Sequence, residues 1–200
     1  YSNLRLRQSP NGYVWTDPQT GKVQLETVDY FKVGSLLPKF NMGWTGTLGY
    51  KDLVLSWAVT GRFGGNVVSD TQAVIDRYGV SQVSADARLA GGVPVPGNGI
   101  VDAQNYYETI SQAPGTYYIY DATNVRLADL TLSYTFPRAM LKNIADLTLS
   151  LTGKNLWMIY CKAPFDPEST SSTTNNFYQG VDYFQQPSMR TYGFNVKLTF

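Results

Sequence analysis

Hydrophobic and polar residues alternate strictly over the last ten residues of the chain, 191–200. The apolar positions are Tyr192, Phe194, Val196, Leu198 and Phe200, and the positions between them hold Thr, Gly, Asn, Lys and Thr. Because successive side chains of a β-strand point to opposite faces, this pattern predicts a strand with one apolar and one polar face. Such a strand fits a soluble sandwich with one wet face, or a membrane barrel with an apolar outside and a wet lumen.

Four further segments repeat this alternation, at 40–50, 53–63, 128–136 and 147–157, and residues 1–7 are typical of a shorter strand. Each long segment has roughly 9–11 residues, which is the length that a tilted strand needs to cross a bilayer. Strands of soluble proteins cluster near five or six residues. The polar faces are mostly Thr, Ser, Gly and Asn, which suits a water-filled interior. Recurrence and length therefore favour the membrane barrel.

Short and long connections alternate along the chain. The short ones are a two-residue turn at 51–52 and a ten-residue link at 137–146, and the long ones cover 8–39, 64–122 and 161–189. A transmembrane barrel has this arrangement because its turns are short on the periplasmic side and its loops are long on the outside. The connections thus give a second, independent indication of a barrel.

One short helix is predicted within the second long connection, at 70–78. Ser69 stands at the N-cap position and Gln72 follows three residues later, which is the spacing of a capping box. Gly79 then ends the helix.

The composition supports an all-β chain. Aromatic residues make up 14%, including 15 tyrosines, and charged residues only 16%, below the usual quarter. The formal charge of +1 gives no electrostatic footprint for nucleic acid.

The same composition argues against an enzyme. The chain has no histidine, and Cys161 is its single cysteine, so neither a disulfide within the chain nor a thiolate metal site is expected. Asp166 and Glu168 flank Pro167 at the start of a loop and are interpreted as turn residues rather than an acid/base pair. No catalytic residue, metal site or cofactor is predicted.

Six fragments carry a family resemblance: LPKFNMGW at 37–44, GRFGGN at 61–66, VRLADLTLSYTFP at 125–137, GKNL at 153–156, FDPE at 165–168 and RTYGF at 190–194. In this order and spacing they resemble the late barrel of SusC/RagA-type TonB-dependent outer-membrane transporters. The resemblance covers most of the chain from about residue 30 onward.

The resemblance implies an antiparallel transmembrane barrel of about 22 strands with a plugged lumen. This chain, 1–200, is then expected to be its C-terminal portion, with about six strands and long extracellular loops. The plug domain and the earlier strands would belong to a longer polypeptide. Six strands alone leave two open edges, and each unpaired backbone group in hydrocarbon costs several kcal/mol. The edge strands are therefore expected to need partners.

The resemblance also implies a function and partners. Members of the family lie in the outer membrane of Gram-negative bacteria and import large nutrients, commonly oligosaccharides and sometimes peptides. They take energy through the TonB complex and are covered by a SusD-like surface lipoprotein. The terminal Phe200 resembles the signal that the barrel-assembly machinery recognises. The alternatives are a passive porin, which shares the strands but lacks a plug, and a soluble glycan-binding β-sandwich.

Tyrosines of the long connections are the candidate ligand-binding residues. A tyrosine offers a flat apolar ring and a hydroxyl group, which suits sugar rings and also protein interfaces. The alternative is that these side chains pack the loops together or contact a lid protein. The residues are Tyr106, Tyr107, Tyr117, Tyr118, Tyr120, Tyr178 and Tyr183.

Aromatic residues at the strand ends are candidates for the membrane girdles. Trp157 and Tyr192 have lipid-facing parity near the outer ends of their strands, and Tyr50, Phe136 and Phe200 have it near the inner ends. Girdles of Trp and Tyr form at this level of a barrel. The alternative is that they are ordinary core aromatics.

Charged residues fall on both parities. Arg62, Lys154 and Lys197 have lumen-facing parity and are expected to pair with carboxylates across the barrel or plug. Arg126 and Arg190 have lipid-facing parity at outer strand ends, where they would meet headgroup phosphates or mark a local change of register.

Overall fold

The computed structural model describes residues 1–97, 99–137, 145–169 and 180–199. The chain divides into two compact units. The strand unit comprises 37–65, 121–169 and 186–200, and the helical unit comprises 1–36, 66–120 and 170–185. Each of the three long connections predicted from the sequence contributes to the helical unit.

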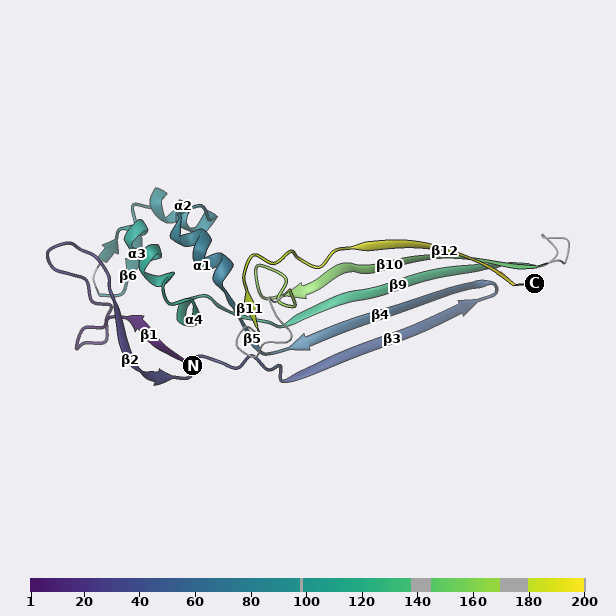
Figure 1. Ribbon diagram of the computed structural model, residues 1–200, viewed down its shortest axis with the longest axis horizontal. Coiled ribbons are helices and arrows are strands. Elements are labelled where there is room, and N and C mark those ends of the chain that lie inside the picture. The colour runs from purple at the N-terminus through teal and green to yellow at the C-terminus, as the bar shows by residue number, and fades with distance from the viewer. Residues whose placement is uncertain (98, 138–144, 170–179, 200) are drawn as a thin grey trace. The chain divides into compact units, whose positions relative to one another are not determined.

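Five long strands form the sheet of the strand unit, in the order β12-β10-β9-β4-β3 (Figure 1). Every neighbouring pair is antiparallel. The five alternating segments are confirmed as strands, and the all-β fold class with them. Their bounds are β3 Phe40–Tyr50, β4 Leu53–Phe63, β9 Asn124–Phe136, β10 Asp146–Cys161 and β12 Thr191–Thr199.

The predicted two-residue turn joins β3 to β4. Tyr50 lies opposite Leu53, which leaves Lys51 and Asp52 as the turn. Lys51 has a φ of 53°, in the left-handed region that tight hairpin turns use. Gly or Asn adopts this conformation more readily, which is why the Lys-Asp pair is a weak turn signal in the sequence.

Among its described residues, the helical unit contains four helices and several short strands. The helices are α1 Asp70–Arg77, α2 Gln82–Leu89, α3 Ala103–Ile110 and α4 Pro114–Tyr117. The strands are β1 Ser2–Leu6, β2 Leu25–Phe31, β5 Asn66–Ser69, β6 Val93–Val95, β7 Gly99–Val101, β8 Ile119–Asp121 and β11 Val181–Asp182. Strands β1 and β2 pair antiparallel, as do β6 and β7, and β11 runs parallel to β5.

The strand expected at 1–7 is present as β1, but it belongs to a different sheet. Its five residues pair with β2, with Leu6 opposite Leu25. At this length β1 is too short to cross a bilayer. Among the described residues the long sheet therefore has five strands, and the expected count of about six is corrected by one.

Helix α1 confirms the predicted helix. The Ser69 hydroxyl accepts a hydrogen bond from the Gln72 amide at 3.1 Å, as an N-cap does. The other half of the capping box is not formed, because the Gln72 side chain donates to Asp76 Oδ1 at 2.8 Å instead. Helices α2 and α3 were not predicted, although Ser81 and Asp102 cap them in the same way.

A compact apolar core holds the helical unit together. Its buried members come from the short strands, from helices α1 and α3 and from the segments before β2 and after α4, so residues far apart in the sequence meet there. They are Leu6, Val23, Ala73, Val95, Val101, Ala103, Tyr107, Ile110 and Tyr118.

Within the described ranges, no helix has both the length and the apolar character needed to span a membrane.

Candidate functional site

The long sheet has one apolar face that runs across all five strands. In the central row, Leu48, Leu55, Leu132, Leu151 and Phe194 lie side by side in register. Leu48 is 62% exposed and Phe194 64%. A soluble sandwich would bury such a row between two layers, whereas an unlayered sheet presents it to its surroundings.

The opposite face of the sheet carries hydroxyl groups that bond in pairs across neighbouring strands. Four such pairs have oxygen–oxygen distances of 2.9–3.2 Å. These side chains satisfy one another and still offer lone pairs to water. The polar face therefore has the character expected of a wet lumen. The pairs are Thr47–Ser56, Thr131–Thr152, Ser133–Ser150 and Thr135–Thr148.

The predicted girdle residues lie toward the two ends of the apolar face. Tyr50, Trp157 and Tyr192 are exposed at 69%, 61% and 75%. Phe136 is half-buried and meets Tyr134 edge to face, with ring centroids 4.8 Å apart. Phe200 lies outside the described residues. Contact of these rings with a membrane interface stays a prediction.

A bulge in β9 moves Arg126 off the apolar face. Asp129 lies opposite Ala58, but Leu127 lies opposite the next residue, Val59, so Ala128 is inserted between the two pairs. One extra residue exchanges the two faces for the rest of the strand. Two alternatives were given for Arg126, a contact with headgroup phosphates and a local change of register, and the structure has the change of register. The Arg126 side chain is only 8% exposed.

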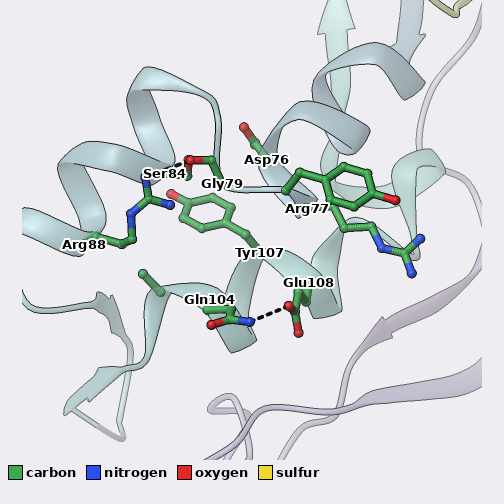
Figure 2. Close-up of a pocket in the computed structure, with 10 residues that line it drawn as sticks. Asp76, Arg77, Gly79, Ser84, Arg88, Gln104, Tyr107 and Glu108 are labelled. Carbon is green, nitrogen blue, oxygen red and sulfur yellow. Dashed lines mark hydrogen bonds between the residues drawn. The ribbon is translucent and has the colours of Figure 1, made fainter.

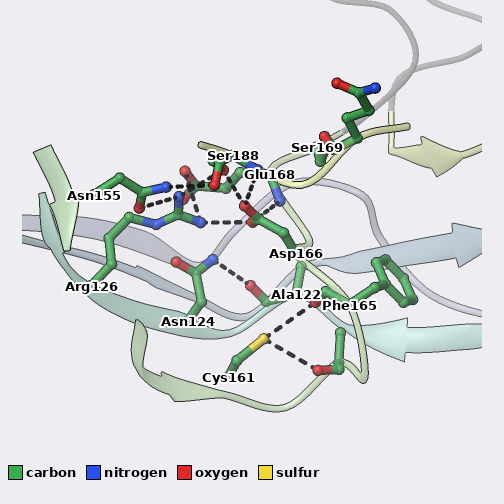
Figure 3. Close-up of polar contacts among 12 residues, drawn as sticks. Ala122, Asn124, Arg126, Asn155, Cys161, Phe165, Asp166, Glu168, Ser169 and Ser188 are labelled. Carbon is green, nitrogen blue, oxygen red and sulfur yellow. Dashed lines mark hydrogen bonds and ion pairs between the residues drawn. The ribbon is translucent and has the colours of Figure 1, made fainter. Parts of the chain in front are cut away.

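The buried Arg126 guanidinium holds together two parts of the loop between β10 and β12 (Figure 3). Its Nη2 lies 2.8 Å from Asp166 Oδ1 and 3.4 Å from Glu168 Oε2. Its Nη1 donates to Asn155 Oδ1 at 3.4 Å and to the Ser188 hydroxyl at 3.3 Å. We call these five residues the Arg126 cluster.

Asp166 is the acceptor at the centre of the Arg126 cluster. It accepts from the Glu168 amide at 3.1 Å, which is the turn role expected from the sequence, and from the Ser188 hydroxyl. Burial raises the pKa of this carboxyl group, but hydrogen bonds from Ser188 and Arg126 outweigh burial, and the pKa lies below its usual value. The ion pair with Arg126 was not predicted, because the bulge that creates it leaves no clear sequence signal.

The remaining charged candidates lie on or beside the long sheet. Lys154 is opposite Asp129 on the polar face, and Lys197 is opposite Thr148. Arg62 lines a cavity of about 520 Å³ together with Thr60 and Glu168. Arg190 is exposed and precedes β12 directly. Pairing of the first three with carboxylates across a barrel stays a prediction, as does a headgroup contact for Arg190.

The helical unit contains a cavity of about 340 Å³ between the end of α1, α2 and α3 (Figure 2). Asp76 is 5% exposed and accepts a hydrogen bond from Gln72. The Arg88 guanidinium donates to the Gly79 carbonyl at 2.8 Å. We call this space the helical-unit pocket, and its lining residues are Asp76, Arg77, Tyr78, Gly79, Ser84, Arg88, Ala103, Gln104, Tyr107 and Glu108.

Most of the predicted ligand tyrosines pack in or against the core of the helical unit. Tyr107 and Tyr118 belong to the core itself, and Tyr106, Tyr117 and Tyr120 pack against it. The Tyr117 hydroxyl accepts from the Leu6 amide at 2.6 Å. Burial raises the pKa of all five phenols.

Of these tyrosines, Tyr107 also lines the helical-unit pocket. Tyr183 is 56% exposed and meets Phe184 edge to face. Tyr178 lies outside the described residues. Ligand binding by these tyrosines stays a prediction. The positions of the five tyrosines in or against the core agree with the alternative that they pack the loops together. In the part of the chain that the structure describes, no group of three or more potential metal ligands is present.

No protein-family model matches the chain. The sequence is similar to two TonB-dependent receptors of Formosa agariphila. Receptor P26 is 27% identical over 218 residues, which cover 100% of this chain and 20% of the receptor. Receptor P3 is 26% identical over 197 residues, which cover 96% of this chain and 19% of the receptor. The chain thus spans about a fifth of the length of the curated relatives it matches.

The fold is similar to that of the RagAB peptide importer in two states. The match to the "closed-closed" state has a TM-score of 0.63 at 17% identity and covers 97% of this chain and 20% of that chain. The match to the "open-open" state has a TM-score of 0.63 at 18% identity and covers 98% of this chain and 22% of that chain. The predicted resemblance to a portion of a SusC/RagA-type TonB-dependent receptor is thereby confirmed.

Proposed function

We propose that this chain is a portion of a SusC/RagA-type TonB-dependent transporter whose barrel lies in the outer membrane of a Gram-negative bacterium. The observation that carries the proposal is the long sheet with one exposed apolar face and one hydroxyl-bearing face. The first suits acyl chains and the second a wet lumen. Strands of 9 to 16 residues are long enough to cross the hydrocarbon when tilted.

The proposed activity is active import of large nutrients, with oligosaccharides as the favoured cargo and peptides as the second. The length and alternation of the strands support a barrel, and the similarity to TonB-dependent receptors supports energy coupling. RagAB, whose fold this chain resembles, is a peptide importer, and peptide cargo is therefore kept as a candidate for this chain. No enzymatic step is part of the proposal.

The proposal includes four partners. A SusD-like surface lipoprotein covers the outer opening, and the TonB complex acts through a plug domain outside residues 1–200. Outer-membrane lipid surrounds the apolar face. The fourth partner is the barrel-assembly machinery, which is proposed to recognise Phe200.

Energy dependence separates the importer from a passive porin. The full-length receptor is expressed in a strain that lacks its own copy, and uptake of fluorescently labelled oligosaccharide and peptide pools is measured. Deleting TonB is expected to reduce uptake to the level of the receptor-less strain, because transport through a lumen closed by a plug needs energy from the inner membrane. Uptake that persists without TonB would favour the porin.

Behaviour in detergent separates a membrane sheet from a soluble sandwich. The isolated 200 residues are expected to aggregate in buffer and to need detergent, because the apolar face is exposed across five strands. Size-exclusion chromatography and thermal unfolding by circular dichroism give the readouts. A monomer that unfolds cooperatively in detergent-free buffer would contradict the barrel proposal and support the sandwich.

A further inference from the structure

The helical-unit pocket combines buried polar groups with charges that balance. Asp76 and Glu108 contribute two negative charges to its lining, and Arg77 and Arg88 contribute two positive ones. The lining therefore has no net charge. Such a lining gives no overall preference to an anion or a cation, and it is compatible with a neutral ligand that can both donate and accept hydrogen bonds.

Two polar groups of the pocket have hydrogen-bonding capacity left. Asp76 accepts from Gln72 and has the Tyr118 phenol as a neighbour, whereas an ionised carboxylate can accept about four hydrogen bonds. Tyr107 lines the pocket, and its hydroxyl group forms no hydrogen bond with another described residue, so it is available to a ligand there. A ligand hydroxyl could donate to Asp76 and accept from Tyr107.

The pocket also has an aromatic wall. The Tyr107 ring reaches from α3 toward Ser84 and Gly79, beside the Arg88 guanidinium (Figure 2). Burial and then the negative charge of Asp76 raise the pKa of the Tyr107 phenol, so the two groups are electrostatic neighbours. A flat ring beside planar amide, carboxylate and guanidinium groups suits a ligand with an apolar C–H face and hydroxyls around its edge.

We infer that the helical-unit pocket binds one neutral sugar unit of a saccharide chain. The inference rests on the proposed import function and deepens it by giving the saccharide cargo a contact site. The volume of about 340 Å³ lies at the lower end of the range of small-molecule sites, about 300–1,000 Å³. That volume suits a single ring with its substituents.

Other ligand classes fit the lining less well. An anion would approach Asp76, and a primary amine would approach Arg77 and Arg88, so each leaves a like charge unfavourably close. A short peptide brings both an ammonium and a carboxylate group, and each of these charges loses hydration on entering a pocket of this size. A neutral ring with several hydroxyls meets every polar group of the lining without a like-charge contact.

The test uses the full-length receptor in detergent and the methyl glycosides of glucose, galactose and mannose as probes. Glucuronate, glucosamine and trialanine are the anionic, cationic and peptide comparisons. Binding is measured by saturation-transfer NMR and calorimetry. At least one methyl glycoside is expected to bind more tightly than all three comparisons.

Two substitutions locate the binding. Tyr107→Phe keeps the ring and removes the hydroxyl, and it is expected to weaken binding about 3- to 10-fold; Asp76→Asn, which removes the charged acceptor, is expected to weaken it about 10-fold or more. Tyr106→Phe is the matched control, because Tyr106 packs beside Tyr107 but does not line the pocket. It is expected to leave binding unchanged. If Asp76→Asn does not fold, the comparison of sugar binding between Tyr107→Phe and Tyr106→Phe decides whether the pocket is the binding site.

Several results would overturn the inference: no glycoside binds, a charged probe or trialanine binds more tightly, or Tyr107→Phe and Tyr106→Phe bind alike. Outer-membrane assembly and TonB-dependent uptake are measured on the same receptor. Intact uptake without sugar binding at this pocket refutes only the inference. A receptor that does not assemble in the outer membrane refutes the proposed function.

Discussion

Replacing Leu132 with arginine is expected to destabilise the membrane-inserted receptor by about 2–4 kcal/mol. Leu132 belongs to β9, the middle strand of the long sheet, and lies between Leu55 and Leu151 on the apolar face. Its row lies about midway between the Trp157 and Phe136 ends of that face, where a charge enters hydrocarbon at the greatest depth. The measurement is urea unfolding of the full-length receptor in lipid vesicles, followed by tryptophan fluorescence.

Thr131→Arg is the matched control for this substitution. Thr131 is the adjacent residue on β9, and its hydroxyl bonds to Thr152 on the polar face. An arginine there extends into the proposed wet lumen and is expected to cost much less than Leu132→Arg. Equal losses for the two substitutions, or the larger loss for Thr131→Arg, would contradict the assignment of the apolar face to lipid.

Removing the Arg126 side chain is expected to have the second large effect. In Arg126→Ala, Asp166 keeps its charge at a site where its side chain is 9% exposed, and it loses its ion-pair partner. Breaking a buried pair in this way costs about 3–5 kcal/mol, because an uncompensated charge stays in a low-dielectric site. The measurement is equilibrium unfolding of the full-length receptor, with hydrogen exchange to show whether the loop around residues 166 and 188 opens first.

The exposed pair between Lys162 and Asp121 provides the comparison. Its nitrogen–oxygen distance, 2.8 Å, equals that of Arg126–Asp166, but the side chains are 50% and 38% exposed. Solvent screens such a pair, so Lys162→Ala is expected to change stability far less than Arg126→Ala. Similar losses in the two variants would show that burial of the Arg126 cluster is energetically unimportant.

The Arg126 cluster also predicts a pH dependence. The folded-state pKa of Asp166 lies below its usual value, so its stabilisation is complete above the unfolded pKa of about 4 and is lost as the pH falls below it. Wild-type receptor is therefore expected to lose stability between pH 5 and pH 3 more steeply than Asp166→Asn, which has no proton to take up there. Parallel pH profiles would contradict this assignment.

The long sheet could be predicted from the sequence because its signal is local and repeats. Each strand alternates with period two, and one exposed face leaves the alternation uninterrupted, so the ends of β3 and β4 follow directly from the residue pattern. The bulge at Ala128 shows where this reasoning stops. The inserted alanine is small and has no distinctive sequence pattern around it. Only the pairing of Leu127 with Val59 in the structure shows that Arg126 has changed faces.

The helical unit was harder to predict because contacts between distant segments hold it together. The Leu6 amide bonds to Tyr117, and the Ser69 hydroxyl donates to Asp182 at 2.7 Å. Ser81 and Asp102 do cap α2 and α3, so those two helix starts could have been found from their N-cap residues. The pocket between the helices has no counterpart in the sequence, since its lining comes from three separate segments.

The tyrosines illustrate the same limit. Five of them are close in the sequence and are candidate ligand-binding residues, but two of their rings belong to the core and three pack against it. Tyr107 differs because it lies on α3 and also lines the pocket. Its position depends on which face of α3 packs against neighbouring elements, and a cluster of one residue type in the sequence does not reveal that face.

The β3–β4 hairpin contains one contact that alternation cannot supply. Gly46 lies opposite Trp57, and a Cβ atom at position 46 would come within 2.2 Å of the indole ring. A slip of one residue between these strands would exchange their faces, but a slip of two would preserve them. After a two-residue slip the indole would meet Trp44 or Leu48 in place of the glycine and would clash with it. Gly46 and Trp57 thus select one strand alignment among several that would keep the same apolar and polar faces. The shapes of these two side chains exclude alignments that hydrophobicity alone would allow.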